Sequence, residues 1–300
     1  MASLEEVRKE YEMTEEEIND MYERVARSMF ENIAPNANGI PECVITGGQP
    51  GSGKSGLVST AATEFRDEGK QCIVLDVDLF RGFYKNAGEL ATRYPEYYSE
   101  ITDKPLGVIM RRLLEETITK GYNFIFEGTL ANTQIVETIR KYNNNYRIKA
   151  KLMATSKYES LLSLFERYLE MKQYIGMGRL TSIDAHNVRY DSFTALIPTL
   201  EGKGIEVDVY ERGATQSTPI LLRADKDNSR FPTVQNAVEF GRSESQRACM
   251  KNAERRLTLI EQEIIQLNDR SVMDEFQKLQ AIFRKDFFLQ TIREDDDSRE

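Results

Sequence analysis

The sequence GQPGSGKS at residues 48–55 decides the fold, because its glycines, lysine and serine have the spacing of a phosphate-binding loop. An apolar run at residues 43–45 precedes it and a helical pattern at residues 57–65 follows it, so the loop joins a strand to a helix. The glycines let backbone N–H groups curl around a phosphate, and the helix N-terminus adds a positive dipole. We therefore predict that a nucleotide phosphate is bound by Gly48, Gln49, Pro50, Gly51, Ser52, Gly53, Lys54 and Ser55.

Composition limits the class of protein. The chain has 300 residues, 40% of them hydrophobic, and a net charge of −9, so it can build a sizeable core and offers no broad basic face to nucleic acid. The N-terminus is acidic, and no apolar run approaches the roughly 18 residues that a membrane span requires. The three cysteines form no C-x-x-C pair. We expect a cytoplasmic protein without a nucleic-acid or membrane partner.

Strands alternate with helices along most of the chain, which predicts an α/β fold: a P-loop kinase-like, three-layer arrangement around a mostly parallel sheet. We expect an N-terminal helical cap at residues 1–38, the kinase core at 39–225, a C-terminal helical extension at 226–293 and a disordered tail at 294–300. The apolar spacing at residues 234–292 indicates a helical hairpin, which we expect to pack on the core rather than to bind a partner. Residues 80–102 are rich in aromatics and have no clear period, and a helix is predicted to begin at Pro105.

Phosphoryl transfer needs in-line positioning and neutralised charge, and the sequence offers groups for both. Lys54 can reach the β- and γ-phosphates, and Ser55 can ligate Mg²⁺. Arg167 and Arg179 flank a Gly-Met-Gly break and could close as a lid on the γ-phosphate, although surface ion pairs are an equal alternative.

A kinase also needs a base for the acceptor hydroxyl, and Asp78 is the candidate. If the strand at residues 72–75 continues, Asp76 shares a face with Asp78; Asp76 could then orient water on Mg²⁺, or it could simply cap a turn. Glu127 follows the next strand and is a candidate metal-supporting acid, through water or Ser55. His186, the chain's only histidine, is expected to be a solvated or core residue.

These motifs, in this order, resemble the zeta toxin family of bacterial toxin–antitoxin systems. The similarity covers about residues 40–212 and rests on the loop at 47–55, Asp76-Val77-Asp78, Gly121-Tyr122-Asn123, Glu127-Gly128-Thr129, Glu166-Arg167-Tyr168, and Arg179 with Asp184-Ala185-His186. It implies an ATP- or GTP-using kinase that phosphorylates the 3′-hydroxyl of UDP-N-acetylglucosamine. It also implies a helical, epsilon-type antitoxin that blocks the nucleotide site. By motif match Lys54 is the P-loop lysine, Asp78 the base that meets the substrate hydroxyl, and Arg167 and Arg179 the γ-phosphate arginines, with Glu127 and Thr129 at the substrate.

The motifs expected at the nucleotide site match the family, but those expected at the acceptor-substrate site depart from the family pattern. Tyr84-Lys85-Asn86 stands where relatives often have His-Pro, Leu130-Ala131-Asn132 lacks a basic residue, and Arg111 falls where a helix acid is expected. A different UDP-sugar or a broader acceptor range is therefore an open alternative. So are a P-loop kinase of another small hydroxyl compound, such as a metabolite or antibiotic, and a nucleotide-binding switch or scaffold whose C-terminal helices carry the function.

Overall fold

The computed structural model describes residues 3–36, 39–94, 97–128, 130, 133–176, 178–213, 218–227, 229–268 and 270–297. Within them one six-stranded sheet has the order β2-β3-β1-β4-β5-β6. The strands are β1 (Glu42–Gly47), β2 (Ile73–Leu75), β3 (Phe124–Glu127), β4 (Arg147–Met153), β5 (Glu206–Glu211) and β6 (Ile220–Arg223). The first five strands are parallel and β6 pairs antiparallel with β5. The expected α/β fold with a mostly parallel sheet is confirmed.

The central strand β1 is buried along its whole length between β3 and β4, as expected of a parallel strand covered on both faces. Its register places Thr46 opposite Glu127 of β3, and Leu75 of β2 lies opposite Phe126. Because parallel strands end at one edge of the sheet, the phosphate loop, the residues after β2 and Glu127 all meet there.

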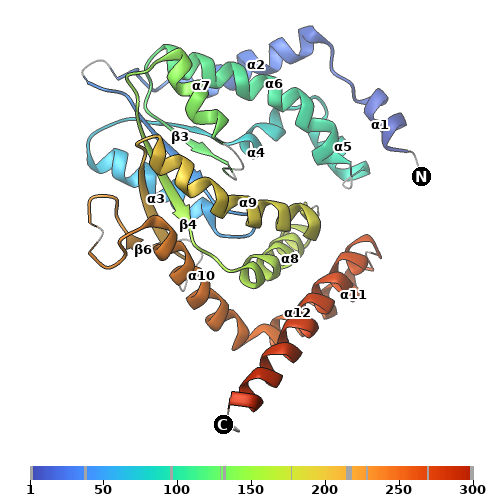
Figure 1. The fold of residues 1–300 in the computed structure, drawn as a ribbon. Helices are drawn as coiled ribbons and strands as arrows, with labels where there is room; N and C mark the ends of the chain where they lie inside the picture. The colour runs from blue at the N-terminus through green and yellow to red at the C-terminus, as the bar shows by residue number, and fades with distance from the viewer. Residues whose placement is uncertain are drawn as a thin grey trace.

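Helices cover both faces of the sheet (Figure 1). On one face α3 (Lys54–Asp67) packs through Ala61 and Phe65 on Val44 and Ile125. Lys151 of β4 is buried on that side and donates to Glu64 of α3 over 2.8 Å. The other face carries α6 (Tyr98–Thr119), α7 (Gln134–Tyr142) and α9 (Ile183–Gly202), whose apolar side chains join the main core cluster. This arrangement fixes the helix that begins at the phosphate loop.

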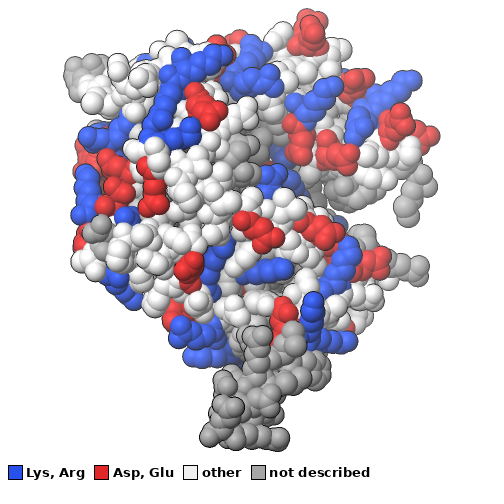
Figure 2. Space-filling view, in the orientation of Figure 1, with Lys and Arg blue, Asp and Glu red and all other residues white. Residues whose placement is uncertain are grey.

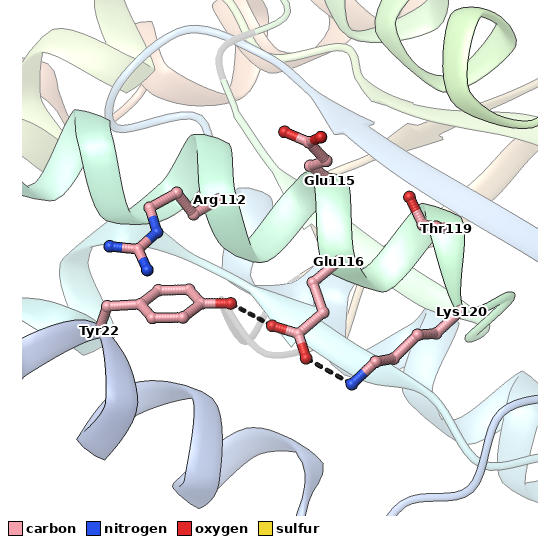
Figure 3. A pocket seen from close by; sticks show the side chains of 6 residues that line it. All are labelled: Tyr22, Arg112, Glu115, Glu116, Thr119 and Lys120. Carbon is pink, nitrogen blue, oxygen red and sulfur yellow. Dashed lines mark hydrogen bonds and ion pairs between the residues drawn. The ribbon is translucent and has the colours of Figure 1, made fainter. Parts of the chain in front are cut away.

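Two helices precede the sheet, α1 (Leu4–Glu10) and α2 (Glu15–Phe30), and each begins with a capping box. Tyr22 of α2 donates a hydrogen bond to Glu116 of α6, and Arg112 stacks 3.7 Å above the Tyr22 ring (Figure 3). Glu116 also pairs with Lys120 at 2.6 Å. The two contacts of Tyr22 hold α2 against α6.

The segment expected to be irregular is largely helical. It contains α4 (Val77–Phe80), the 3₁₀ turn η1 (Arg81–Phe83), α5 (Ala87–Arg93) and the first turns of α6, which begins at Tyr98 and not at Pro105. The helical periodicity of this segment could not be recognised in the sequence because several of its aromatic residues pack inward, with Phe80 and Tyr84 buried. Helix α6 continues through Pro105 because Ile101, Leu106 and Ile109 keep one apolar face on the core.

Three helices rather than a two-helix hairpin follow the sheet: α10 (Val234–Met250), α11 (Ala253–Leu267) and α12 (Arg270–Asp297). Asn268, with φ of 50°, ends α11 in the left-handed conformation. The three helices pack on α8 (Lys157–Ile175), and a second apolar cluster includes Phe165, Ile264 and Phe276. Helix α12 continues to Asp297, into the segment expected to be disordered, and residues 298–300 lie outside the described ranges.

The surface in Figure 2 carries acidic and basic side chains interspersed over the face in view. Among the described residues, none of the helices combines the length and the apolar character needed to cross a bilayer.

Candidate active site

The predicted phosphate loop runs from the end of β1 to Ser55, the second residue of α3. Gly51 and Gly53 have φ values of 77° and 94°, which side chains rarely adopt, and a Cβ at Gly51 would lie 2.2 Å from the Ser160 carbonyl oxygen. Lys54 Nζ donates to the Gln49 carbonyl oxygen over 3.2 Å, and Ser55 is exposed at the start of α3. The loop therefore has the backbone shape and the cation that a phosphate site requires.

Gln49 ties the loop to the helices beside it. Its Nε2 donates to the Thr155 carbonyl oxygen over 2.8 Å and to Ser160 Oγ over 3.1 Å, and Ser160 Oγ lies 2.8 Å from His186 Nε2. His186 is fully buried, and burial lowers its pKa to about 4, so the imidazole is neutral at physiological pH. Of the two expected alternatives, solvated or core, His186 is the core histidine, and its hydrogen bond supports the loop.

Two carboxylates stand beside Lys54 at the edge of the sheet. Burial, followed by the negative charge of Asp76, raises the pKa of Glu127 to about 7. Burial lowers the pKa of Lys54 to about 8, although the charge of Glu127 opposes this effect. The strand before Asp76 ends at Leu75, so Asp76 and Asp78 do not share a strand face. Asp76 instead caps α4, accepting from the Asp78 N–H over 2.9 Å.

Asp78 lies on α4 among three arginines. Arg81 Nε donates to Asp78 Oδ1 over 2.9 Å, and Arg179 Nη1 lies 3.3 Å from the same oxygen. Burial would raise the pKa of Asp78, but the Arg81 hydrogen bond and the charges of Arg81, Arg179 and Arg167 hold it below its ordinary value. Asp78 is therefore a carboxylate, able to accept a proton, at neutral pH.

A hollow of about 200 Å³ brings together three of the four predicted catalytic side chains, Asp78, Arg167 and Arg179, but not Lys54. Asp78, Arg81, Arg167 and Arg179 all line it, although they come from α4, η1, α8 and the segment after α8. Arg167 is close enough to Lys54 to lower the lysine's pKa by charge repulsion. Arg167 therefore lies near both the phosphate loop and the candidate base, and Arg179 lies beside the candidate base.

A larger hollow, of about 560 Å³, contains Glu127 and is within the size range of small-molecule sites. Val77 of α4 lines it, next to Asp78 of the first hollow. Its lining includes two cations, Arg111 and Lys141, and two aromatic residues, Phe126 and Tyr142. Thr129, predicted to contact substrate, lies outside the described residues. A third hollow, beside Tyr22 and Arg112 (Figure 3), includes no residue of the phosphate loop.

The groups around Lys54 suit a nucleotide with a hard cation. Within the described part of the chain, Gln49 Oε1, Ser52 Oγ and Thr46 Oγ1 are buried without a hydrogen-bond partner. Ser55, Asp76 and Glu127 offer the oxygen ligands that Mg²⁺ prefers. The described residues hold no group of three or more acidic, histidine or cysteine side chains that would form a metal site alone. The residues therefore fit Mg²⁺ held jointly with bound phosphates.

Sequence reasoning missed Arg81 and Arg212. Arg81 is buried and also donates to Asp103 over 2.6 Å. It lies three residues after Asp78, a spacing that brings two side chains together on a helix, but this pairing could be inferred only after α4 had been recognised as helical. Arg212 follows β5 and lies over the phosphate loop, with its side chain 3.9 Å from where a Cβ of Gly53 would stand. Its partners, Glu159 and Ser163, are about fifty positions away, so no local pattern revealed it.

The fold and the site define a P-loop protein of the kinase-like α/β class. The family model described as "Zeta toxin" matches residues 27–218. The chain belongs to the zeta toxin family.

Individual relatives agree with this assignment. "Toxin zeta" of Streptococcus agalactiae is 26% identical over 278 residues, covering 90% of this chain and 91% of that protein. "Toxin zeta" of Streptococcus pyogenes is 28% identical over 249 residues, covering 80% of this chain and 81% of that protein. A solved chain from the PezAT chromosomal toxin–antitoxin system of Streptococcus pneumoniae has a TM-score of 0.65 at 22% identity, covering 84% of this chain and 98% of that one.

Proposed function

We propose that this protein is a kinase that transfers the γ-phosphoryl group of ATP or GTP to the 3′-hydroxyl of UDP-N-acetylglucosamine or a related UDP-sugar. It acts in the cytoplasm as the toxin of a toxin–antitoxin pair, and an epsilon-type helical antitoxin is its partner. The observation that carries the proposal is the position of Asp78. It lines one hollow with Arg167 and Arg179, and its neighbour Val77 lines the larger hollow beside Glu127.

In the proposed reaction the phosphate loop holds the nucleotide, with Lys54 at the β- and γ-phosphates. The acceptor oxygen attacks the γ-phosphorus, its proton passes to the Asp78 carboxylate, and the bond to the β-phosphate oxygen breaks to release the nucleoside diphosphate. Arg167 and Arg179 neutralise negative charge on the transferred group. Ser55 and Glu127 would hold Mg²⁺, which supplies further neutralisation of the phosphates when bound.

The larger hollow is the proposed acceptor site. Arg111 and Lys141 can pair with the diphosphate of a UDP-sugar, and Tyr142 and Phe126 offer aromatic faces to the base or sugar. These cations explain how an anionic acceptor could bind although the whole chain is acidic, since the attraction is local.

The test is to incubate the protein with Mg²⁺, ATP or GTP and a panel of UDP-sugars, and to search by mass spectrometry for one added phosphoryl group. Expression in bacteria, with and without a co-expressed candidate antitoxin, measures growth inhibition in parallel. Lys54→Ala is the control, because it removes the loop's own cation from the transferred phosphate and should abolish transfer and toxicity together.

The outcomes separate the alternatives. Phosphorylation of a hydroxyl compound other than a UDP-sugar would establish the general small-molecule kinase. Growth arrest by Lys54→Ala without any transfer would overturn the toxic-kinase proposal and favour a scaffold.

A further inference from the structure

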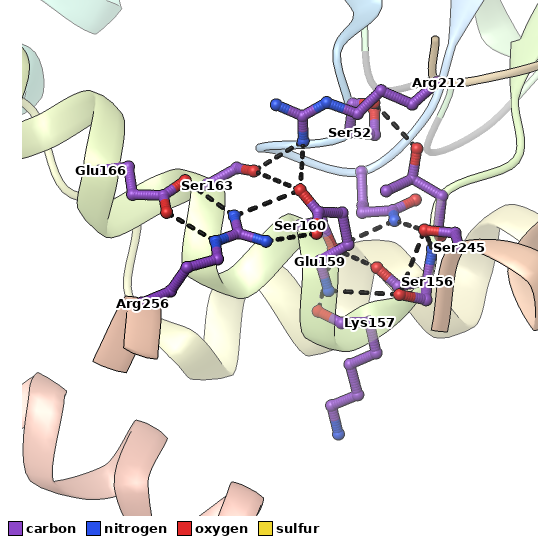
Figure 4. A network of polar contacts seen from close by, with 12 residues as sticks. Ser52, Ser156, Lys157, Glu159, Ser160, Ser163, Glu166, Arg212, Ser245 and Arg256 are labelled. Atoms are coloured by element: carbon purple, nitrogen blue, oxygen red, sulfur yellow. Dashed lines mark hydrogen bonds and ion pairs between the residues drawn. The ribbon is translucent and has the colours of Figure 1, made fainter. Parts of the chain in front are cut away.

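The C-terminal helices hold α8 through one arginine. Arg256 of α11 donates from Nε to Glu166 Oε1 and from Nη2 to Glu166 Oε2, each over 2.7 Å. It also donates from Nη1 and Nη2 to the two oxygens of Glu159. Figure 4 shows the guanidinium between the two carboxylates of α8. All three of its nitrogens are therefore engaged by one neighbouring helix.

The same network reaches the phosphate loop. Glu159 Oε1 accepts a second arginine, Arg212, over 2.9 Å, and Arg212 also donates to Ser163 Oγ over 2.6 Å (Figure 4). The Arg212 side chain in turn lies against Gly53. Arg256, Glu159 and Arg212 have side chains only 11–15% exposed, so these charge-assisted bonds are shielded from water.

The position of Glu166 gives the network a consequence for the site. Glu166 immediately precedes Arg167, and both belong to one uninterrupted helix, Lys157–Ile175. The apolar cluster between α8, α11 and α12 binds the helices together, but apolar burial has no direction. Hydrogen bonds to two glutamates spaced two turns apart fix both the rotation and the translation of α8.

We propose that Arg256 is a positioning residue for phosphoryl transfer: it orients α8 so that Arg167 faces the phosphate site. The helices after residue 226, proposed above only as an extension, thereby become part of the catalytic apparatus. This inference rests on the proposed function for the catalytic role of Arg167, but the restraint that Arg256 places on α8 can be measured without any substrate.

The first experiment measures how firmly α8 is held, because amide exchange follows the local opening of a helix. Amide hydrogen exchange over residues 160–175 is followed by mass spectrometry in the full chain without nucleotide. Arg256→Gln should exchange faster there than the unaltered protein, while peptides of α3 are unchanged. Arg255→Gln, one position earlier on the same helix and exposed, is the matched control and should behave as the unaltered protein. Unchanged exchange in Arg256→Gln, or an equal rise in both variants, overturns the proposal.

The second experiment measures the consequence for turnover, with Mg²⁺-ATP and UDP-N-acetylglucosamine. Arg256→Gln should lower kcat roughly 10- to 100-fold, as small misplacements remote from the chemistry do, with KM for ATP nearly unchanged. Arg256→Lys keeps the positive charge but loses the planar guanidinium that donates to both glutamates. Its kcat should therefore lie between that of the unaltered protein and that of Arg256→Gln. Full activity of Arg256→Lys would overturn the orientation argument.

A double-mutant cycle separates positioning from general damage. In an Arg167→Ala background, Arg256→Gln should cause little further loss of kcat, because the group that it orients is already gone. Additive losses would assign Arg256 to stability alone and contradict the proposal. If Arg167→Ala itself leaves kcat unchanged, the proposed function of Arg167 fails, and the exchange experiment still decides whether Arg256 restrains α8.

Discussion

Arg179 Nη1 lies 3.3 Å from Asp78 Oδ1, which joins the segment after α8 to the helix that carries the candidate base. Both side chains are nearly half exposed, so this pair is a weak, breakable contact rather than a structural clamp. Arg81 binds the same oxygen from a buried position. In the proposed reaction, Arg179 would leave Asp78 for the phosphate, while Arg81 would keep the carboxylate in place.

Arg179→Ala and Arg167→Ala should lower kcat more than they weaken nucleotide binding. In the proposed reaction each arginine meets charge that develops on the transferred group, so its main effect should be on the transition state. Steady-state kinetics and calorimetric binding of a non-hydrolysable nucleotide measure the two quantities separately. An unchanged kcat in both variants would show that the two arginines only form ordinary surface ion pairs.

Asp78→Asn should leave the fold and ATP affinity intact while transfer falls by about two to four decades, the usual contribution of a general base. The change keeps the size of the side chain and removes its negative charge. Asp76→Asn is the matched comparison and should lower the transfer rate less than Asp78→Asn does, because Asp76 caps α4 through one backbone N–H. The assignment would be reversed if Asp76→Asn were inactive and Asp78→Asn nearly normal.

Glu127→Gln should raise the Mg²⁺ concentration needed for half-maximal turnover by roughly 10- to 100-fold, the usual effect of losing a group that supports a metal ligand. Glu127 is half-buried beside Lys54 and Asp76, where a neutral amide cannot help to balance a divalent cation. A magnesium titration at saturating nucleotide measures the effect. Glu137→Gln, exposed on α7, serves as the control and should titrate normally.

His186→Gln should remove part of the acid sensitivity of folding. The folded pKa of His186 is about 4, below the ordinary 6.5, so the unfolded chain gains a proton before the folded chain does. The stability that neutral His186 contributes is therefore complete above pH 6.5 and is lost as the pH falls to 4, by up to about 3 kcal/mol.

Urea unfolding of both proteins at intervals from pH 7 to 4 measures this contribution. The free energy of unfolding of His186→Gln should fall less steeply with acid than that of the unaltered protein. Since the chain has one histidine, no other imidazole contributes to the difference. Parallel curves for the two proteins would show that His186 can be protonated in the folded state without cost.

The sequence predicted the parts of the site that have a local pattern. The phosphate loop, Asp78 and the strand ending at Glu127 could be found because each is set by a short motif between a strand and a helix. The helices between residues 77 and 105 were missed because their aromatic side chains are buried from several directions and follow no single period. Arg81, Arg212 and Arg256 were missed as functional groups because their roles depend on contacts across the fold.

The contact between Gly51 and α8 determines which mutations should inactivate the protein in a genetic selection. The Ser160 carbonyl oxygen occupies the space of any side chain at this position, and the positive φ also opposes one. Every amino-acid replacement of Gly51 introduces a Cβ, so even alanine must push the loop from the helix or leave the loop misshapen. If the protein arrests growth, cells that survive its unopposed expression should carry many different replacements at codon 51, because every side chain is excluded there. At codon 78 the set of surviving replacements would instead show which chemical property of the Asp78 side chain the toxin needs.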